Sequence, residues 1–304
     1  MDPNDEHPLA RELAEEIENF QEIARYLNPS PGEIPELEGI DIAGLSMPFR
    51  EVIGGDHIIY IDFKRRYDLE RRITRARARG RTEVARNLEQ LKRRAGILLA
   101  DVSGHRMTDA LIGAMLHQAF LVGCYYELDR YGEITTRVFE HLNTRFYRTT
   151  AVNKYFTMLY GEITSGGQFR FISAGHQPPA IFSREFGKFV KVGRDQIVSF
   201  PPVGLLPSGN DDDTDDPVDT VLQGKKRYEV NQVRLLTPGD LLLLSTDGLA
   251  EHGGGNFIGD VLEGVIREAG GEDAASICGR IEEAVLKHGK PEDDVSAVVV
   301  KRTG

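Results

Sequence analysis

Apolar residues recur at helical spacing near the start of the chain. The apolar positions, mostly three or four residues apart, are Leu9, Leu13, Ile17, Phe20, Ile23, Ala24 and Leu27. Prolines at positions 29, 31 and 35 follow them, so the pattern predicts an amphipathic helix over residues 8–27 that ends at the prolines. Two roles are open for this helix. It covers the core of its own domain, which we favour because most amphipathic helices do so, or it pairs with its copy in a homodimer.

Short apolar runs with strand character dominate from residue 40 onward. The clearest are IDIAGLSMPF (40–49), HIIYIDF (57–63), GILLADV (96–102), LLLLSTD (241–247) and VSAVVV (295–300). A turn-rich TSGG at 164–167 separates two further runs and predicts a β-hairpin. Helical spacing returns at residues 107–128 and 273–287, so the chain mixes helices and strands.

Aspartates stand beside four of the strand-like runs. They are Asp56, Asp101, Asp247 and the pair Asp293 and Asp294. Strand ends from remote parts of a sequence bring such side chains together, and like charges destabilise a fold unless a cation neutralises them. Oxygen ligands suit Mg²⁺ or Mn²⁺ better than zinc. The pattern therefore predicts a hard divalent metal site.

Composition sets wider limits. With 304 residues, 40% of them hydrophobic, the chain is long enough to bury a substantial core. The net charge of −11 argues against general nucleic-acid binding, which needs excess Lys and Arg. Cys124 and Cys278 lie far apart without CxxC spacing, so neither a disulfide framework nor a zinc site is expected. No apolar run approaches the ~20 residues of a membrane span and the first residues lack a signal-peptide pattern, so we expect a cytoplasmic protein.

Six motifs follow one another along the chain. They are GGD at 54–56, DVSGH at 101–105, AGHQPP at 174–179, PPVGLLP at 201–207, PGDLLLLSTDGL at 238–249 and DDVSAVVV at 293–300. None is decisive alone, but the ordered series resembles the metal-dependent serine/threonine phosphatases of the type 2C (PPM) family, in its bacterial SpoIIE and RsbU branch. The resemblance implies an α+β fold, a four-layer αββα sandwich in which helices flank two packed antiparallel sheets. We expect an N-terminal helical arm at 1–35 and a phosphatase domain at 36–304.

The resemblance also implies how the aspartates hold two or more Mn²⁺ or Mg²⁺ ions. Asp101 would be the carboxylate that bridges both metals, with the main-chain carbonyl of Val102 on one of them. Asp56 would serve the first metal and Asp247 the second. Two metals about 3.5 to 4 Å apart bind one water, lower its pKa and present hydroxide in line with the phosphoester bond, so no protein nucleophile is required.

In the EDDVS motif, the family pattern aligns Asp293 with a further metal ligand and Asp294 with its neighbour. We favour Asp293 as the ligand. Binding by either residue, or by both through water, stays open.

A general acid for the leaving serine oxygen is harder to assign. His105 is the nearest candidate for this catalytic role, with a surface or capping role as the alternative. His176 is either such a group or a turn residue packed beside the site. Arg106 replaces a glycine of the family pattern, and a solvated arginine is favoured over a contact with substrate phosphate. CYYELDR at 124–130 matches the lettering of thiol phosphatases, but it lacks a glycine and carries two acids, so we interpret it as a helix end.

Two segments are longer than the family pattern. The basic insertion at about 64–95 has thirteen Lys and Arg against four acidic residues within 64–94, a net charge of +9. Its apolar spacing predicts a protruding helix or a helical hairpin broken at Gly80. Docking of an acidic partner, pairing with the chain's own aspartates and simple solvation are open for these charges, and we favour docking. The acidic loop at about 208–230 has six aspartates between 211 and 219, which indicates a solvated loop; calcium binding is disfavoured because the ligand spacing is missing.

The predicted function is hydrolysis of phosphoserine or phosphothreonine on a regulatory phosphoprotein, in this branch of the family usually a small anti-sigma-factor antagonist. Two other classes stay open: a scaffold on the same fold without turnover, and a hydrolase of small phosphate esters. The intact ligand motifs argue against the scaffold. Hydrolysis of p-nitrophenyl phosphate with added Mn²⁺ tests the scaffold, and a comparison of metabolites with phosphoproteins tests the small-ester hydrolase.

Overall fold

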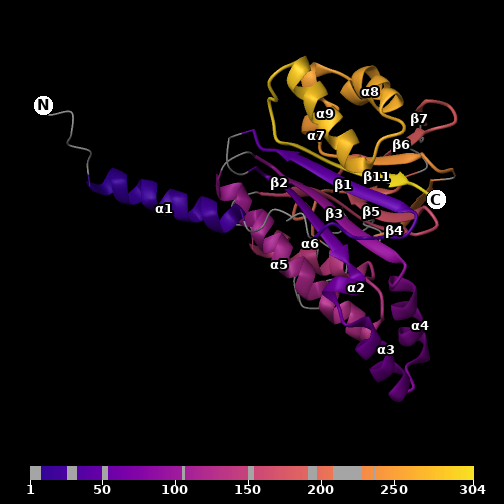
Figure 1. The fold of residues 1–304 in the computed structure, drawn as a ribbon. Helices are drawn as coiled ribbons and strands as arrows, with labels where there is room; N and C mark the ends of the chain where they lie inside the picture. Colours follow the sequence, from indigo (N-terminus) through magenta and orange to yellow (C-terminus); the bar gives the residue numbers. More distant parts are fainter. Residues whose placement is uncertain are drawn as a thin grey trace, which may run out of the picture.

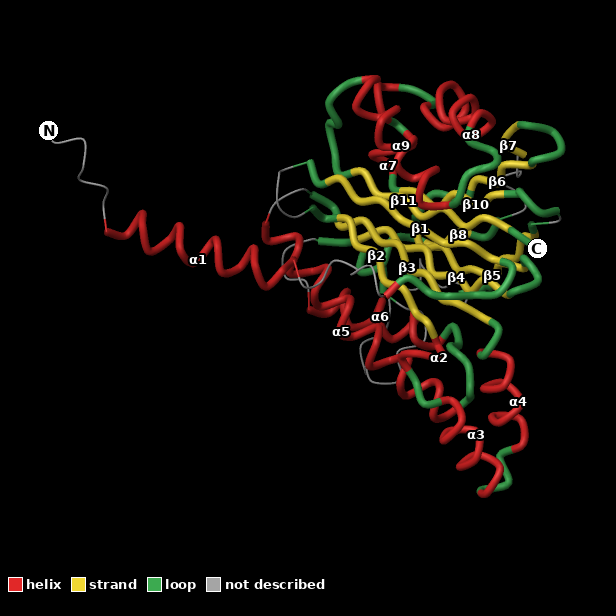
Figure 2. The backbone as a smooth tube through the Cα atoms, viewed as in Figure 1, coloured by secondary structure: helices red, strands yellow, loops and turns green. Residues whose placement is uncertain are grey.

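The computed structural model describes residues 8–25, 33–49, 54–104, 107–149, 154–190, 197–207, 228–235 and 237–304. Two β-sheets stack face to face at the centre, and helices cover both outer sides (Figure 1, Figure 2). The predicted α+β sandwich of two sheets with flanking helices is therefore confirmed. None of the helices among these residues is long and apolar enough to cross a membrane.

The first sheet has five strands among the described residues, in the order β1-β11-β10-β6-β7. They are β1 (Ile40–Met47), β11 (Val295–Arg302), β10 (Leu241–Ser245), β6 (Ala180–Ser183) and β7 (Lys188–Val190). The second sheet has the order β2-β3-β4-β5-β8, with β9 paired to β5. Its strands are β2 (Asp56–Asp62), β3 (Arg94–Val102), β4 (Phe156–Thr164), β5 (Gln168–Ala174), β8 (Ser199–Phe200) and β9 (Asn231–Arg234). β4 and β5 pair antiparallel around the TSGG turn, which confirms the predicted hairpin.

Helices form the two outer layers. The layer against the second sheet contains α5 (Met107–Arg130) and α6 (Arg137–Thr149) (Figure 1). The layer against the first sheet contains α7 (Asp247–Ala250), α8 (Glu263–Glu268) and α9 (Ala274–His288), with short helical turns at His252–Gly254 and Ile258–Leu262. Cys124 is buried in the first of these layers and Cys278 in the second, both as free thiols.

Alternate residues of the central strands face different cores. In β3, Ile97 and Leu99 lie in the core between the two sheets, whereas Leu98 and Ala100 face the core shared with α5 and α6. This follows from the two-residue period of a strand, and it explains why GILLADV is apolar without interruption. A strand that is buried on both faces shows no polar alternation.

The basic insertion forms α2 (Phe63–Arg66), α3 (Leu69–Ala78) and α4 (Thr82–Leu91) between β2 and β3. α3 and α4 form a hairpin that projects from the body (Figure 1). Gly80 turns the chain with φ at 68°, a left-handed conformation that favours glycine. Ile73 and Leu88 pack in the same core as α5. The prediction of a helical hairpin is confirmed.

Many of the hairpin's cations are used within the chain. Its ion pairs include Arg72–Asp129, Arg77–Glu89, Lys92–Glu70 and Lys92–Glu89. Arg81 donates to the carbonyl oxygens of Asp129, at 2.9 Å, and Arg130, and Asn87 Nδ2 donates to that of Tyr131 at 3.0 Å. Because the last carbonyls of a helix have no partner within the helix, these bonds cap the C-terminus of α5.

Helix α1 (Pro8–Arg25) confirms the predicted N-terminal helix over its described residues, whereas Leu27 lies outside them. α1 runs away from the sheets (Figure 1). Its Leu13 and Ile23 are 60% and 68% exposed. The favoured covering role is therefore wrong for these side chains, which bury no core surface in this chain.

The acidic loop lies outside the described residues, apart from residues 228–230. The predictions made for residues 208–227, including the disfavoured calcium site, are not tested.

Candidate metal centre

Strand pairing brings the predicted ligands to one edge of the sandwich. In the second sheet, Asp56 at the start of β2 is the Cα partner of Asp101 near the end of β3. In the first sheet, Asp247 follows β10, and Asp293 and Asp294 precede β11, the antiparallel neighbour of β10. Antiparallel pairing places the end of one strand beside the start of the next, so each sheet gathers its aspartates at one end.

Hydrogen bonds join these two ends across the sheets. The Thr246 hydroxyl donates to Asp56 Oδ2 at 2.8 Å, and the Gly55 amide donates to Asp294 Oδ2 at 2.6 Å. The Val102 amide donates to the Gly55 carbonyl at 3.3 Å, which ties the strand end after Asp101 to the GGD turn. The predicted acidic ligands therefore share one edge.

The carboxylates at this edge act on one another. Burial raises the pKa of Asp101 to about 7, with further contributions from Asp247, Asp293 and Asp294. Burial and then the Asp101 charge raise the pKa of Asp56 well above its usual value. Burial and then Asp293 raise the pKa of Asp247. A divalent cation would relieve this repulsion.

Glycines permit the close approach of backbone segments here. A Cβ on Gly55 would lie 2.6 Å from the Gly104 carbonyl oxygen and 2.9 Å from that of Val102. A Cβ on Gly248 would lie 2.0 Å from the carbonyl oxygen of Asp294. Neither position has room for a side chain, so GGD and TDG require their glycines for packing.

The donors at this edge fit magnesium or manganese. They are carboxylate, carbonyl and hydroxyl oxygens, which these ions prefer. Within the ranges that the structure describes, no three His, Cys, Asp or Glu side chains form a ready chelating group. The fit therefore rests on the all-oxygen donor set, the mutual repulsion of the carboxylates and their shared edge.

Asp293 and Asp294 have different environments. Asp294 is 4% exposed, and its two carboxylate oxygens accept the amides of Phe49 at 2.7 Å and Gly55 at 2.6 Å. Asp293 is exposed, and its Oδ1 accepts the Asp294 amide at 2.8 Å. This arrangement supports Asp293 as the ligand and gives Asp294 a structural role in joining three segments.

Asp247 and Asp293 line a cavity of about 590 Å³ at this edge. Glu251 and Glu292 line it too, although the sequence motifs assigned them no role. Glu251 contributes to the raised pKa of Asp247, after burial and Asp293. Its position four residues after Asp247, one turn along a helix, is the signal that would have found it.

The candidate acids have separate outcomes. His105 and Arg106 lie outside the described residues. His176 is buried, with its Nδ1 2.8 Å from the Thr157 hydroxyl, and Thr157 is the strand partner of Asp101. Burial lowers the pKa of His176 to about 4. The turn residue packed beside the site is therefore the interpretation of His176 that its environment supports.

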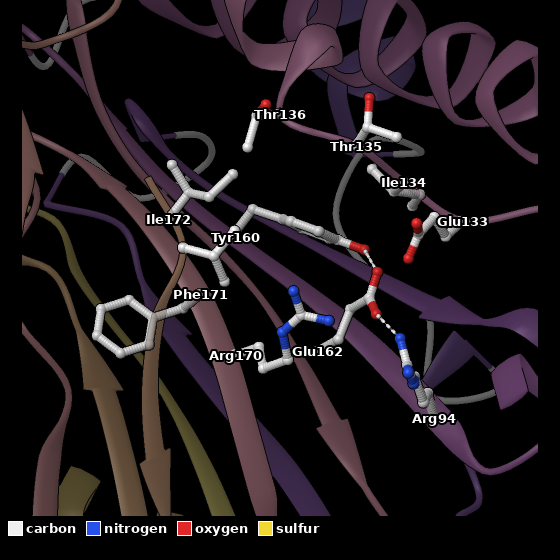
Figure 3. Close-up of a pocket in the computed structure, with 11 residues that line it drawn as sticks. Arg94, Glu133, Ile134, Thr135, Thr136, Tyr160, Glu162, Arg170, Phe171 and Ile172 are labelled. Carbon is white, nitrogen blue, oxygen red and sulfur yellow. Dashed lines mark hydrogen bonds and ion pairs between the residues drawn. The ribbon is translucent and has the colours of Figure 1, made fainter. Parts of the chain in front are cut away.

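Figure 3 shows a second cavity, of about 230 Å³, which Arg94 lines. Arg94 begins β3, whereas Asp101 lies near the other end of that strand. Glu162 crosses the cavity, accepting from the Tyr160 hydroxyl at 2.9 Å and from Arg94 Nη1 at 3.1 Å. Arg170 also lines it (Figure 3). No predicted metal ligand lines this cavity, so it is separate from the candidate centre.

The family model for stage II sporulation protein E (SpoIIE) matches residues 92–303. The chain belongs to the SpoIIE family of type 2C serine/threonine protein phosphatases. A search of curated protein sequences gives no match.

Solved structures share the fold of this SpoIIE-family chain. The SiaA-PP2C domain of Pseudomonas aeruginosa has a TM-score of 0.62 and 14% identity, over 98% of this chain and 99% of that one. The RsbU and RsbW domains of Rv1364c from Mycobacterium tuberculosis have a TM-score of 0.61 and 20% identity, over 90% of this chain and 64% of that one. The PP2C domain with a regulatory fragment of SpoIIE from Bacillus subtilis has a TM-score of 0.56 and 16% identity, over 87% of this chain and 64% of that one. This chain thus spans 64% of the length of the latter two.

Relatives with the same fold have been crystallised with divalent ions. RsbX is in complex with magnesium, at a TM-score of 0.52 and 12% identity, over 88% of this chain and 98% of that one. The catalytic domain of PstP is in complex with two manganese ions. It has a TM-score of 0.51 and 11% identity, over 87% of this chain and 99% of that one. Divalent metals are therefore general to this fold family.

Proposed function

We propose that this protein hydrolyses phosphoserine or phosphothreonine on a protein substrate with the aid of two Mn²⁺ or Mg²⁺ ions. The observation that carries this proposal is the edge where Asp56, Asp101, Asp247 and Asp293 meet across two sheets. By analogy with its branch of the family, the substrate is a regulatory phosphoprotein such as an anti-sigma-factor antagonist. A cytoplasmic location is part of the same proposal.

Different residues at this edge would bind each of the two ions. Asp101 would contact both ions, with Asp56 and the Val102 carbonyl on one and Asp247 and Asp293 on the other. Bound ions supply the Lewis acidity that activates water near neutral pH. Supporting bonds hold these ligands: the Thr246 hydroxyl orients Asp56.

Hydrolysis of p-nitrophenyl phosphate and of a phosphoserine peptide tests the proposal. Wild-type protein should hydrolyse both with Mn²⁺ and neither with excess EDTA. Asp101→Asn should lose at least a hundredfold in kcat, because it removes charge from the ligand shared by both ions. Near wild-type rates for this variant at saturating Mn²⁺ would show that the centre is assigned wrongly. Turnover of small esters alone would support the small-ester hydrolase instead.

The N-terminal helix supports a further part of the proposal, a homodimer formed through α1. Its Leu13 and Ile23 are exposed on a helix that leaves the body (Figure 1). Pairing of two such helices would bury these side chains. Deletion of residues 1–27 should lower the sedimenting mass to that of a monomer. An unchanged mass would rule out this mode of pairing.

A further inference from the structure

Helices α5 and α6 border a groove of about 370 Å³ that none of the predicted metal ligands lines. Its floor is apolar and includes Ala119, Val138 and Leu142. Its rim is exposed and polar, with Tyr126, Arg130, Arg137, His141 and Arg145. An apolar floor inside a cationic rim suits a ligand that carries an apolar group among negative charges.

The cations of the rim come from two helices. Arg137 and Arg145 lie eight residues apart, about two turns, and therefore share one side of α6 with His141 between them, while Arg130 ends α5. Among the described residues that line the groove, Glu127 is the one carboxylate, and its Oε2 accepts the amide and the hydroxyl of Thr135. The groove is thus positive on a chain whose net charge is −11.

Arg130 and Arg137 are free to bind a partner. Both are exposed, and neither forms an ion pair with a carboxylate in the described part of the chain. Each guanidinium lies near the Tyr131 ring, at 5.5 and 6.0 Å from its centroid. Several cations of the α3–α4 hairpin, in contrast, form ion pairs with Glu70, Glu89 or Asp129. Arg81 is engaged in capping α5. The groove is therefore the better candidate for docking than the basic insertion.

We propose that the groove docks an acidic segment of the phosphoprotein substrate. The segment's carboxylates pair with Arg130 and Arg137, and one apolar side chain enters the floor between Ala119 and Leu142. This inference rests on the proposed phosphatase function. The overall negative charge disfavours nucleic acid as the occupant, because a long polyanion would meet the acidic remainder of the surface.

The position of the groove suits a substrate of protein size. α5 begins at Met107, two residues after the last residue of the DVSGH motif, and the groove starts at Ala119 on the same helix. Twelve helical residues separate these positions by about 18 Å. A segment docked in the groove therefore reaches the metal edge only through at least six extended residues or a folded body, so the contact selects the partner and not the phosphorylated residue itself.

Peptide binding without metal tests the groove directly. The probe is the fluorescein-labelled peptide EDELLDED, with the neutral peptide QNQLLNQN as its control, measured by fluorescence anisotropy in EDTA. The acidic peptide should bind at least tenfold more tightly than the neutral one and lose affinity as salt is raised. The double variant Arg130→Glu/Arg137→Glu should weaken its binding at least tenfold. The matched variant Arg71→Glu/Arg79→Glu, with the same charge change on the exposed hairpin, should not.

A second measurement joins docking to catalysis. A phosphoserine peptide is extended by twelve Gly and Ser residues and then by either EDELLDED or QNQLLNQN. The acidic tail should lower KM at least fivefold for wild-type protein and not for the Arg130→Glu/Arg137→Glu variant, with melting temperatures compared to confirm folding. Equal binding of both labelled peptides, or equal weakening by the two double variants, overturns the proposal that the groove binds an acidic segment. Acidic-peptide binding with equal KM values overturns its role in substrate choice. Absence of turnover for both substrates, with binding intact, would instead refute the proposed function.

Discussion

Lys154 forms an ion pair with Asp109, with its Nζ 2.8 Å from Oδ1, and the same ammonium donates to the Ser103 carbonyl at 2.7 Å. Asp109 lies in the first turn of α5 and its side chain is 1% exposed. Gly104, with φ at 115°, lies between them, where a Cβ would stand 2.6 Å from Asp109 Oδ2. One cation from the segment before β4 therefore holds the loop after Val102 against α5.

Lys154→Met should loosen this loop and destabilise the protein. Removal of one partner of a buried ion pair costs about 3 to 5 kcal/mol, and the partial exposure of Lys154 lowers the expected loss to about 2 kcal/mol. Faster hydrogen exchange at residues 103–104 and a smaller Mn²⁺-induced rise in melting temperature should accompany it. Lys154→Arg is the control that keeps the charge. Unchanged exchange in Lys154→Met would mean that the ion pair does not fix the loop.

Asp293→Asn and Asp294→Asn should fail in different ways. Asp294 holds two backbone amides, so its variant should lose about 2 kcal/mol of unfolding free energy in EDTA. Asp293 is exposed, so its variant should keep its stability in EDTA but gain less from millimolar Mn²⁺, because ligand binding stabilises by mass action. Thermal unfolding with and without Mn²⁺ measures both effects. The opposite pattern would exchange the two roles.

Arg94→Met should destabilise the protein without affecting metal binding. Glu162 is buried, and Arg94 supplies its counter-charge. The expected loss is about 3 kcal/mol by urea unfolding, and the double variant Arg94→Met/Glu162→Leu should recover part of it. The Mn²⁺ concentration that half-saturates the protein should stay the same, because this pair lies at the other end of β3 from Asp101. A changed Mn²⁺ requirement would argue for coupling along the strand.

The buried His176 should make stability depend on pH. Its pKa is about 4 in the folded protein and about 6.5 in the unfolded chain, so the unfolded chain binds the proton first as pH falls. Stability from this group is complete above pH 6.5 and decreases below it, by about 2 kcal/mol at pH 5. His176→Asn should therefore lose less stability than wild type between pH 7.5 and pH 5. Parallel curves would show that His176 is not buried in its neutral form.

Arg81→Ala should fray the C-terminus of α5. The side chain donates to the carbonyls of Asp129 and Arg130, and loss of these bonds should cost about 1 to 2 kcal/mol. Hydrogen exchange should accelerate near residues 127–131 and stay unchanged at the start of α5. Arg79→Ala, on the exposed tip of the same hairpin, is the matched control. Equal effects of the two variants would attribute the change to general charge and not to the cap.

The parts predicted from sequence were those with a local signal. GILLADV and VSAVVV are long apolar runs, and the edge that they share follows from the aspartates at their ends. α6 was missed although Val138, Phe139, Leu142 and Phe146 have helical spacing, because no motif drew attention to them.

The contacts that distinguish Asp293 from Asp294 could not be predicted from the sequence. The two hydrogen bonds of Asp294 span 245 and 239 positions of the sequence, and they form only when the two sheets have packed together. The Lys154–Asp109 pair and the Arg81 cap are of the same kind, since no periodicity along the chain encodes which loop a side chain meets.

The two free cysteines give each helical layer its own chemical reporter. Cys124 belongs to α5 and Cys278 to α9, on opposite sides of the paired sheets. Burial raises the pKa of Cys278 to about 12 and that of Cys124 well above its usual value, so each thiol should react only slowly with an alkylating reagent while its layer is closed. Alkylation rates of the unmodified protein therefore time the opening of each layer separately, and mass spectrometry of the two cysteine peptides tells which side has opened.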